Sequence, residues 1–283
     1  MAKIIACIDG SVYSESVADH AAWAAARLSA SVDLLHMLGR RGIADAPLNL
    51  SGSLDLGGRD TLLAELADLD AQKAKLAQKR GRVILAQAAQ RLRDGGIETP
   101  SELLRHGDVV DTLKDFEEDA DLVVIGKRGE AADFAKLHLG SNLERVLRGS
   151  SKPVLVASRA YRPIRRFLIA FDGGPSIVKA VDFIADSPLF VGVACHIFVA
   201  GPDGAAKSPV RDAEERLKQA GFEVTIGRED GEPEEVIARQ VEDTGIDLLV
   251  MGAYGHSRVR TLIIGSTTTA LIRSCKVPVL LFR

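Results

Sequence analysis

Four residues near the end of the chain have the spacing of a loop that binds phosphate. From Gly252 the chain reads Gly-x2-Gly-x9-Gly-Ser, directly after a run of apolar residues. Glycine lets a backbone approach a ligand closely, and a helix that begins at Gly-Ser presents its first N–H groups to an anion. The pattern therefore predicts a phosphate cradle at Gly252, Gly255, Gly265 and Ser266.

The first half of the chain carries a second copy of this pattern. The apolar run that begins at Asp121 corresponds to the run that begins at Asp247, and each run ends at a glycine. The first copy reads Gly-x2-Gly-x10-Gly-Ser, one residue longer than the second. The corresponding cradle residues are Gly126, Gly129, Gly140 and Ser141.

The repetition extends over the whole chain. Residues 3–10 match residues 166–173 at an offset of 163, whereas residues 89–96 match residues 214–221 at an offset of 125. The fall in the offset predicts an insertion in the first half, between about residues 38 and 89. We therefore predict two copies of one unit, at residues 1–157 and 164–283, joined by a short linker.

Composition limits the classes of function. The 283 residues suit two domains, and 46% apolar with 27% charged residues is ordinary for a globular protein. A net charge of −3 gives no case for nucleic acid or an anionic membrane as partner. No apolar run is long enough to span a membrane, and the N-terminus reads as a strand rather than a signal peptide. We expect a cytoplasmic protein whose cysteines, Cys7, Cys195 and Cys275, are buried reduced thiols.

Apolar runs alternate with helical patterns along both halves. This alternation predicts an α/β fold of two tandem, open, parallel five-stranded sheets with helices on both faces. The long helix expected over residues 60–94 should be interrupted near Gly81. Its leucines favour local packing, with a partner surface as the alternative. The expected strands are residues 4–8, 32–38, 102–105, 122–125, 153–157, 167–171, 197–199, 223–226, 248–251 and 279–282, and the other expected helices include residues 14–28, 109–118 and 142–147.

An acidic residue and a glycine loop should meet at one rim of each sheet. Asp9, Asp172, Gly126 and Gly252 all follow or end predicted strands, and such sheets bind ligands beyond the carboxyl ends of their strands. A carboxylate there can bind a ribose hydroxyl, a base amine or a cation, so the combination suits a nucleotide. The alternative for both aspartates is capping of the helix that follows.

These residues resemble the universal stress protein family in its tandem form. Its nucleotide motif, Gly-x2-Gly-x9-Gly-(Ser/Thr), is matched by the second half, and Asp172 matches the aspartate that lies near adenosine and any cation. The resemblance implies a Rossmann-like fold of the adenine-nucleotide alpha-hydrolase type, in which the Val199 backbone reads adenine and Thr267 and Thr268 contact phosphate. It further implies a stress-response role, bound ATP with AMP or ADP as alternatives, Mg²⁺ as the accompanying cation, and pairing of domains through the fifth strands.

The first half departs from this family pattern. Its loop is one residue longer, and Asn142, Leu143 and Glu144 replace the three threonines. The charge of Glu144 is unfavourable near phosphate, although Lys127 and Arg128 within the loop could offset it. We therefore expect nucleotide mainly in the second half, with Asp9 and the first cradle as a weaker site or as a degenerate half kept for packing.

Two classes of function remain. The first is a regulator whose nucleotide occupancy is read by an unknown protein partner. The second is a slow ATPase or autophosphorylating phosphotransfer enzyme, with hydroxyl acceptors at residues 266–269 but no general base that can be named. His138 and His256 are expected to be loop residues, whereas Trp23 and Phe222 are expected in the core. Within one chain the fifth strands, residues 153–157 and 278–282, should pair as an internal pseudo-dimer, and a homodimer is expected beyond that.

Overall fold

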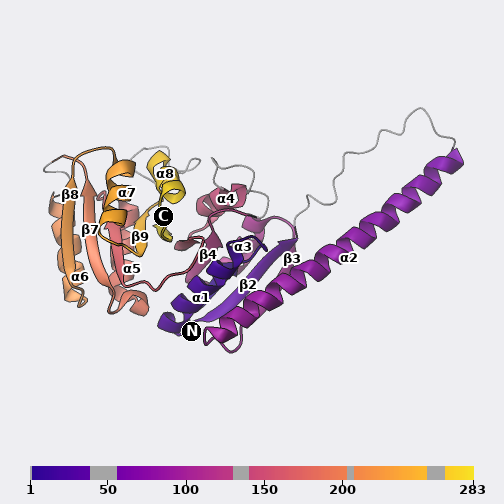
Figure 1. Cartoon of the computed structure of the whole chain (residues 1–283), viewed down its shortest axis with the longest axis horizontal. Helices are drawn as coiled ribbons and strands as arrows, with labels where there is room; N and C mark the ends of the chain where they lie inside the picture. Colours follow the sequence, from indigo (N-terminus) through magenta and orange to yellow (C-terminus); the bar gives the residue numbers. More distant parts are fainter. Residues whose placement is uncertain (1, 39–55, 130–139, 203–206, 254–264) are drawn as a thin grey trace.

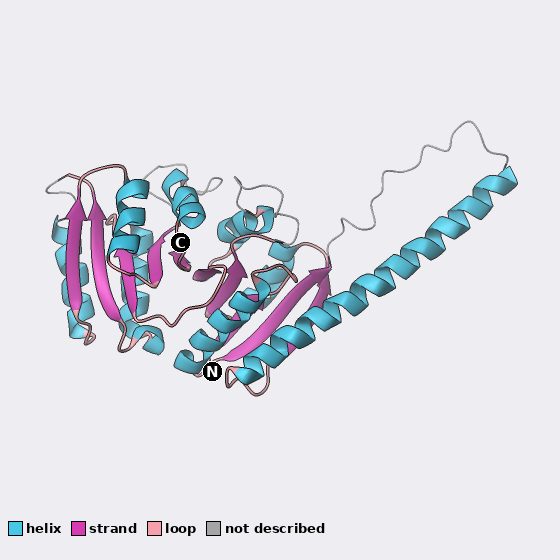
Figure 2. Ribbon diagram, in the orientation of Figure 1, coloured by secondary structure: helices cyan, strands magenta, loops and turns pink. Residues whose placement is uncertain are grey.

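The chain alternates between strands and helices in both halves (Figures 1 and 2). The computed structural model describes residues 2–38, 56–129, 140–202, 207–253 and 265–283. The strands are β1 (Lys3–Cys7), β2 (Ser31–Leu38), β3 (Ser101–His106), β4 (Leu122–Gly126), β5 (Val154–Ala157), β6 (Arg166–Ala170), β7 (Ala194–Ala200), β8 (Val224–Glu229), β9 (Leu248–Gly252) and β10 (Val279–Phe282). The helices are α1 (Ser14–Leu28), α2 (Leu56–Asp94), α3 (Val109–Glu117), α4 (Ser141–Gly149), α5 (Pro175–Asp186), α6 (Lys207–Gln219), α7 (Pro233–Asp243) and α8 (Ser266–Ser274), with a 3₁₀ turn at Pro188–Phe190.

The strands of the described chain join into one sheet. The order is β3-β2-β1-β4-β5-β10-β9-β6-β7-β8, so each half contributes five strands. Neighbours within each half are parallel, whereas β5 and β10 pair antiparallel with Leu155 opposite Leu280. The predicted α/β fold and the predicted pairing of the fifth strands are both confirmed.

The sheet is buried on both faces. Successive side chains of a strand point to opposite faces, so Leu122 and Val124 join one apolar cluster while Val123 and Ile125 join the other. Side chains of α1, α5, α6 and the end of α2 complete the first cluster. Side chains of α3, α4, α7 and α8 complete the second. Trp23 and Phe222 pack against the first cluster, as predicted.

The cysteines of the chain are free thiols rather than a disulfide or a metal site. Cys195 and Cys275 are buried, and Cys7 is half-buried on the last position of β1. Burial raises the pKa of the Cys7 thiol to about 12, with a smaller contribution from the charge of Asp9. It also raises the pKa of Cys195 to about 12. At neutral pH these two thiols are therefore protonated and unreactive. The predicted burial is confirmed for Cys195 and Cys275, whereas Cys7 is half-buried.

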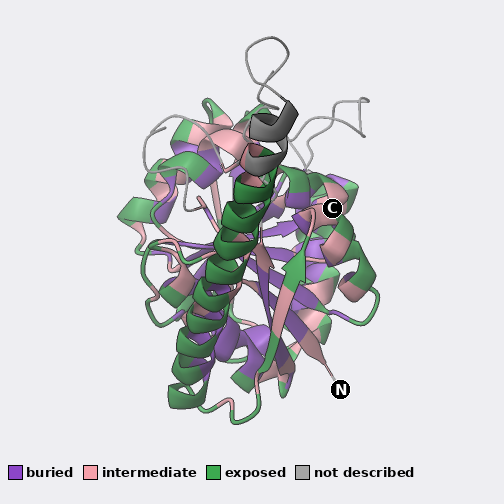
Figure 3. Cartoon of the chain, turned by 90° about the vertical axis from the view of Figure 1, so that its right-hand side faces the viewer, coloured by how far each residue is buried: buried purple, intermediate pink, exposed green. Residues whose placement is uncertain are grey.

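The long helix α2 differs from the prediction in two respects. It runs without a break through Gly81, so the expected interruption is wrong. A Cβ at Gly81 would lie 2.7 Å from Leu104 Cδ1 and 2.9 Å from His36 Cδ2, so glycine lets the helix pack closely on β2 and β3. The expectation that its leucines pack locally is wrong for Leu69 and Leu76, which are 46% and 68% exposed, whereas Leu62 and Leu66 are half-buried. Figure 3 shows the largely exposed surface of this helix.

A buried carboxylate shapes the turn that leads into β5. Glu117, at the end of α3, is 5% exposed. Its Oε1 accepts hydrogen bonds from the Ser150 hydroxyl and from the backbone N–H groups of Ser151 and Lys152. One side chain therefore holds the segment between α4 and the strand that joins the two halves.

We expect Glu117→Ala to lower the free energy of unfolding by about 3 kcal/mol, because each buried donor that loses its acceptor costs roughly 1–3 kcal/mol. Urea unfolding followed by circular dichroism measures this change. The matched control is Glu118→Ala, which removes an exposed carboxylate one residue later and should change stability by less than about 0.5 kcal/mol. Equal effects of the two substitutions would contradict the role of the buried carboxylate.

Candidate functional site

The predicted ligand rim lies where the order of the strands reverses. In the first half the chain crosses from β1 to β2 on one side and to β4 on the other, and β6, β7 and β9 repeat this arrangement. Cys7 pairs with Ile125 and Ala170 with Met251, so the paired strands end at the same level. The residues that follow them therefore meet at one edge of the sheet, as predicted for parallel strands.

The start of α8 presents backbone donors to this rim. Gly265 is the N-cap residue and makes no side-chain cap, and the first helical hydrogen bond runs from the Thr269 N–H to the Gly265 oxygen at 2.9 Å. The N–H groups of Ser266, Thr267 and Thr268 precede that bond, so helix geometry directs them out of the helix terminus. Together with the helix dipole they form a favourable environment for an anion.

The threonine hydroxyls have partners within the protein. Thr268 is buried, and its Oγ1 donates to the carbonyl oxygens of Gly252 and Ala253, both at 3.3 Å. Thr267 Oγ1 lies 3.5 Å from Glu234 Oε2. The hydroxyl of Thr268 therefore ties α8 to the end of β9, and the backbone N–H groups and the exposed Ser266 side chain are the groups that α8 offers to a ligand.

Glu234 is a carboxylate that the sequence reasoning missed. It lies in the first turn of α7, and packing of α7 against α8 brings it to Thr267 although 33 residues separate the two. The sequence feature that could have identified it is its position just after β8, because a helix that follows a parallel strand begins at the rim formed by the carboxyl ends of the strands. The first turn of this helix is acidic, with Glu234 followed by Glu235.

Both predicted aspartates stabilise the turns that follow their strands. Asp172 Oδ1 accepts from the Gly174 N–H at 2.8 Å. Asp9 Oδ1 accepts from the Ser11 N–H at 2.9 Å and from the Ser14 hydroxyl at 3.3 Å. The capping alternative is therefore observed as a turn rather than as the N-cap of the helix. Asp172 is exposed at the rim, where a second role in binding is compatible with its turn.

The backbone N–H and C=O groups of Val199 point toward β8 and not toward β6, where the adenine was predicted to bind. Cys195 and Gly201 donate their N–H groups to β8 and its preceding residue, whereas Phe198 accepts from Phe171 on the β6 side. Successive residues of a strand direct their backbone groups to alternate neighbours, so Val199 faces β8. Ala200, one residue later, has the backbone that faces the predicted site.

The structure brings together the first-half residues that it describes. A Cβ on Gly129 would lie 3.0 Å from Asp9 Oδ2, and one on Gly140 would lie 3.4 Å from the Gly129 nitrogen. A Cβ on Gly126 would lie only 2.7 Å from Tyr13 Cβ, so tyrosine covers this glycine. The repeat places the small Ser176 at the position of Tyr13 in the second half.

Ser141, another predicted site residue, is the first residue of α4, just as Ser266 is the first residue of α8. Leu143, at the position of Thr268, is buried and offers no hydroxyl. Gly255, His138 and His256 lie outside the described residues.

Lys127 points away from the first glycine loop. Its ammonium group donates to the carbonyl oxygen of Cys275 and, at 3.2 Å, to that of Val277, both just before β10. The expectation that Lys127 offsets the charge of Glu144 is therefore wrong for this lysine. Burial lowers the pKa of Lys127 to about 8. The residue joins the two halves instead of serving a ligand.

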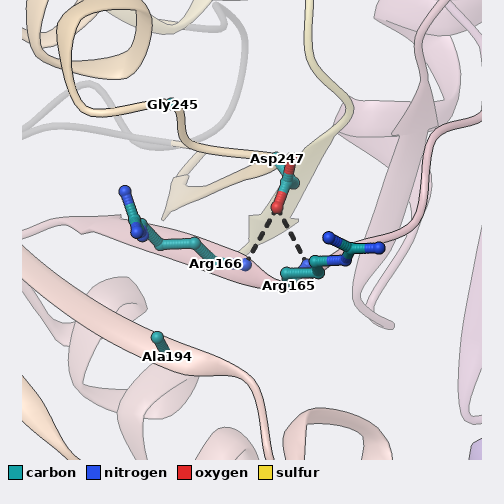
Figure 4. A pocket seen from close by; sticks show the side chains of 5 residues that line it. All are labelled: Arg165, Arg166, Ala194, Gly245 and Asp247. Carbon is teal, nitrogen blue, oxygen red and sulfur yellow. Dashed lines mark hydrogen bonds between the residues drawn. The ribbon is translucent and has the colours of Figure 1, made fainter.

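A surface cavity of about 260 Å³ lies at the opposite edge of the sheet (Figure 4). It is lined by Arg165, Arg166, Ala194, Gly245 and Asp247, around the amino ends of β6 and β7. Asp247 Oδ2 accepts from the backbone N–H groups of Arg165 and Arg166 at 2.9 and 3.0 Å. Asp121 accepts from Lys3 in the same way, at 2.8 Å, so this repeated aspartate supports the strands.

Two further features of the described residues bear on ligands and surroundings. They contain no group of three or more His, Cys, Asp or Glu side chains arranged to hold a metal ion. Among their helices, none has the length and apolar character required to cross a bilayer.

Comparisons with known proteins agree with this architecture. The model of the universal stress protein family matches residues 1–158 and again residues 163–283. A universal stress protein of Synechocystis sp. is 40% identical over the full length of both chains. A crystal structure of a universal stress protein from Archaeoglobus fulgidus covers 99% of this chain and 97% of its own, with 24% identity and a TM-score of 0.70. One from Pseudomonas aeruginosa covers 99% and 92%, with 16% identity and a TM-score of 0.58.

The lowered pKa of Lys127 predicts that the folded chain becomes more stable as the pH rises above about 8. Its pKa of about 8 in the folded chain is below the value of 10.5 for an unperturbed lysine, so the unfolded chain holds this proton more tightly. Between these two values, raising the pH favours folding by relieving the cost of burying the charge. We expect urea unfolding to show wild type gaining stability relative to Lys127→Met across this window. Lys276→Met, at an exposed lysine, is the control and should track wild type at every pH.

Proposed function

The chain belongs to the universal stress protein family, and we propose that it binds an adenine nucleotide in its second half and acts as a regulator. ATP is the proposed ligand, with AMP and ADP as alternatives. Nucleotide occupancy would bias a surface that a partner protein reads during a stress response. The observation that carries the proposal is the set of backbone donors at the start of α8, beside the end of β9 and Asp172.

The residues of the second half fit such a ligand in two groups. Phosphates suit the predicted cradle of Gly252, Gly255, Gly265 and Ser266 together with the N–H groups that begin α8, because the helix fixes those N–H groups before any anion arrives. The exposed Asp172 and the end of β7 suit the adenosine. The sequence predicts that the Val199 backbone reads the adenine, and in the structure the backbone of the next residue, Ala200, faces the site.

Glu234 adds a negative charge beside the phosphate group of this proposal. Its carboxylate lies 3.5 Å from the Thr267 hydroxyl. At this position it interacts favourably with the positive end of the α8 dipole, which would also attract a phosphate. Mg²⁺ bound to the phosphates would supply positive charge and reduce their repulsion from Glu234. The proposal therefore includes Mg²⁺ as a partner of the nucleotide.

The first half supports binding less well. Tyr13 covers Gly126, Lys127 donates to carbonyls of the other half, and the apolar Leu143 replaces a threonine. Each difference removes space or a polar group from the cradle of Gly126, Gly129, Gly140 and Ser141. We therefore propose one nucleotide per chain.

A universal stress protein that aligns with 43% of this chain, at a TM-score of 0.38, was solved in complex with cAMP. That ligand belongs to that protein, and the proposal for this chain rests on its own residues.

The second candidate function is slow ATP hydrolysis, and Glu234 is the observation that favours it. A carboxylate beside the phosphates could orient water or act as a base. However, its hydrogen bond from Thr267 fixes it at the helix terminus, and Asp172 is engaged in a turn at the other end of the proposed site. Regulation therefore remains the better-supported function.

Gly255→Val tests the location of the nucleotide. A branched side chain in the cradle should weaken ATP binding at least about a hundredfold, because each charge-assisted hydrogen bond contributes roughly 1.5–3 kcal/mol. Isothermal titration calorimetry measures the affinity, and mass spectrometry identifies any nucleotide that copurifies. Gly129→Val is the matched control in the first half and should leave the affinity unchanged.

Ser176→Tyr provides a second variant that leaves the cradle sequence intact. It adds the bulk of a tyrosine at the sequence counterpart of Tyr13, in the first turn of α5 near the rim, and should also reduce binding. Thermal unfolding checks that each variant is folded. Loss of binding in Gly129→Val with normal binding in Gly255→Val would reverse the assignment of the halves.

Turnover distinguishes the two candidate functions. We expect steady-state phosphate release far below about 1 per second, the lower end of the usual enzyme range. Glu234→Gln should leave this rate unchanged while preserving the shape of the side chain. Phosphate release at about 10 per second that is lost in Glu234→Gln would support the enzyme instead.

A further inference from the structure

The amino-terminal half of α2 projects beyond the body of the protein (Figures 1 and 3). The other half of this helix packs on the sheet, where Leu85, Ala89 and Leu92 are almost fully buried. In the projecting half, large apolar side chains such as Leu69 and Leu76 are exposed instead. A row of leucines on a projecting helix leaves apolar surface in water that association would remove.

These apolar residues follow the seven-residue repeat of a coiled coil. With residue 62 assigned to position d, every d position up to residue 83 is apolar, whereas the a positions combine one leucine with two cationic residues. Residues 62–82 extend about 30 Å along the helix, which accommodates three heptads. The d positions are Leu62, Leu69, Leu76 and Val83, and the a positions are Leu66, Lys73 and Arg80.

The charges of the projecting helix divide into two blocks. Glu65, Asp68 and Asp70 make residues 62–70 acidic, whereas residues 73–82 are basic. Lys73 Nζ lies 3.9 Å from Asp70 Oδ1 at the boundary between the blocks, and both side chains are half-exposed. A parallel pair of these helices would align like charges. An antiparallel pair would align each acidic block with a basic one.

We propose that this half of α2 forms an antiparallel coiled coil with α2 of a second copy of the chain. The complementary charge blocks identify a second copy as the occupant, because the same helix supplies both halves of the match. The fifth strands already pair within one chain, so this association uses a different surface. It does not depend on the proposed nucleotide.

The heptad positions also set the register. An antiparallel coiled coil packs a positions against d positions, and an axis near residue 71 satisfies this rule along the overlap. Leu66 then lies opposite Leu76 of the second copy, and Leu69 lies opposite Lys73, whose aliphatic stem can cover apolar surface while its charge reaches water. Glu65 lies near Lys79 of the second copy. The two protein bodies lie at opposite ends of the paired helices.

Sedimentation of the full chain at micromolar concentration tests the association. We expect wild type to have twice the mass of one chain and Leu66→Glu/Leu76→Glu to have the mass of one. Val178→Glu, at an apolar residue of α5 that is 44% exposed, should remain dimeric. A monomeric wild type, as expected if another segment of the chain covers the leucines, would overturn the proposal, as would a double variant that stays dimeric.

Charge reversal tests whether the blocks select the partner. Lys75→Glu/Lys79→Glu lowers the net charge of residues 73–82 from +5 to +1, and Glu65→Lys/Asp68→Lys raises the net charge of residues 62–70 from −3 to +1. Each variant therefore loses most of the charge complementarity of the pair. Each variant alone should dissociate at least about tenfold more readily than wild type, and an equimolar mixture should form a heterodimer. A mixture that stays monomeric while wild type is dimeric would reject charge matching.

Cross-linking tests the orientation. A chain with Leu66→Cys should form a disulfide with a chain carrying Leu76→Cys, and neither variant should cross-link to itself. Wild type controls for the native thiols. Self-cross-linking of Leu66→Cys would indicate a parallel pair and contradict the proposed arrangement.

Discussion

The antiparallel pairing of β5 with β10 is the interaction on which the rest of the structure depends. Each half alone would leave the backbone groups of an apolar edge strand without a partner, and such an edge invites aggregation. Pairing Leu155 with Leu280 turns two five-stranded sheets into one and buries both edges. Side chains reinforce this junction, because Lys127 donates to the segment before β10 and Arg283 donates to the Arg148 carbonyl across it. The strands that end at Gly126 and Gly252 consequently belong to one continuous sheet.

The sequence allowed prediction of the features that depend on local pattern. Apolar runs bounded by glycine located the strands to within a few residues, since a strand buried on both faces has few alternatives. The internal repeat then gave the order of elements, and edge burial gave the pairing of the fifth strands. Gly81 was misread because its intrinsic helix propensity is low. In the folded chain its missing side chain permits close contact with His36 and Leu104, a long-range advantage that propensity does not report.

For the candidate site, the features that follow from strand order were predictable, and those that depend on packing between distant elements were not. Topology alone brings Asp172 and Gly252 to one rim, so their placement followed from the order of the strands. The backbone direction of Val199 depends on which neighbour each residue of β7 bonds, and one residue of register reverses it. Glu234 and Lys127 depend on the packing of α7 on α8 and on the junction between halves, respectively. Contacts across 33 and 150 residues leave no periodic signal in a sequence.

Joining both halves in one polypeptide allows the two loops to diverge independently. If the same sheet were assembled from two identical chains, any residue exchanged in one loop would also be exchanged in the other. A lysine directed into the junction, or a tyrosine placed over a glycine, would then appear on both sides. In the tandem chain Lys127 and Tyr13 have the counterparts Ala253 and Ser176. A tandem chain can therefore use a residue such as Lys127 to join the two halves while its second half keeps the spacing of a phosphate loop.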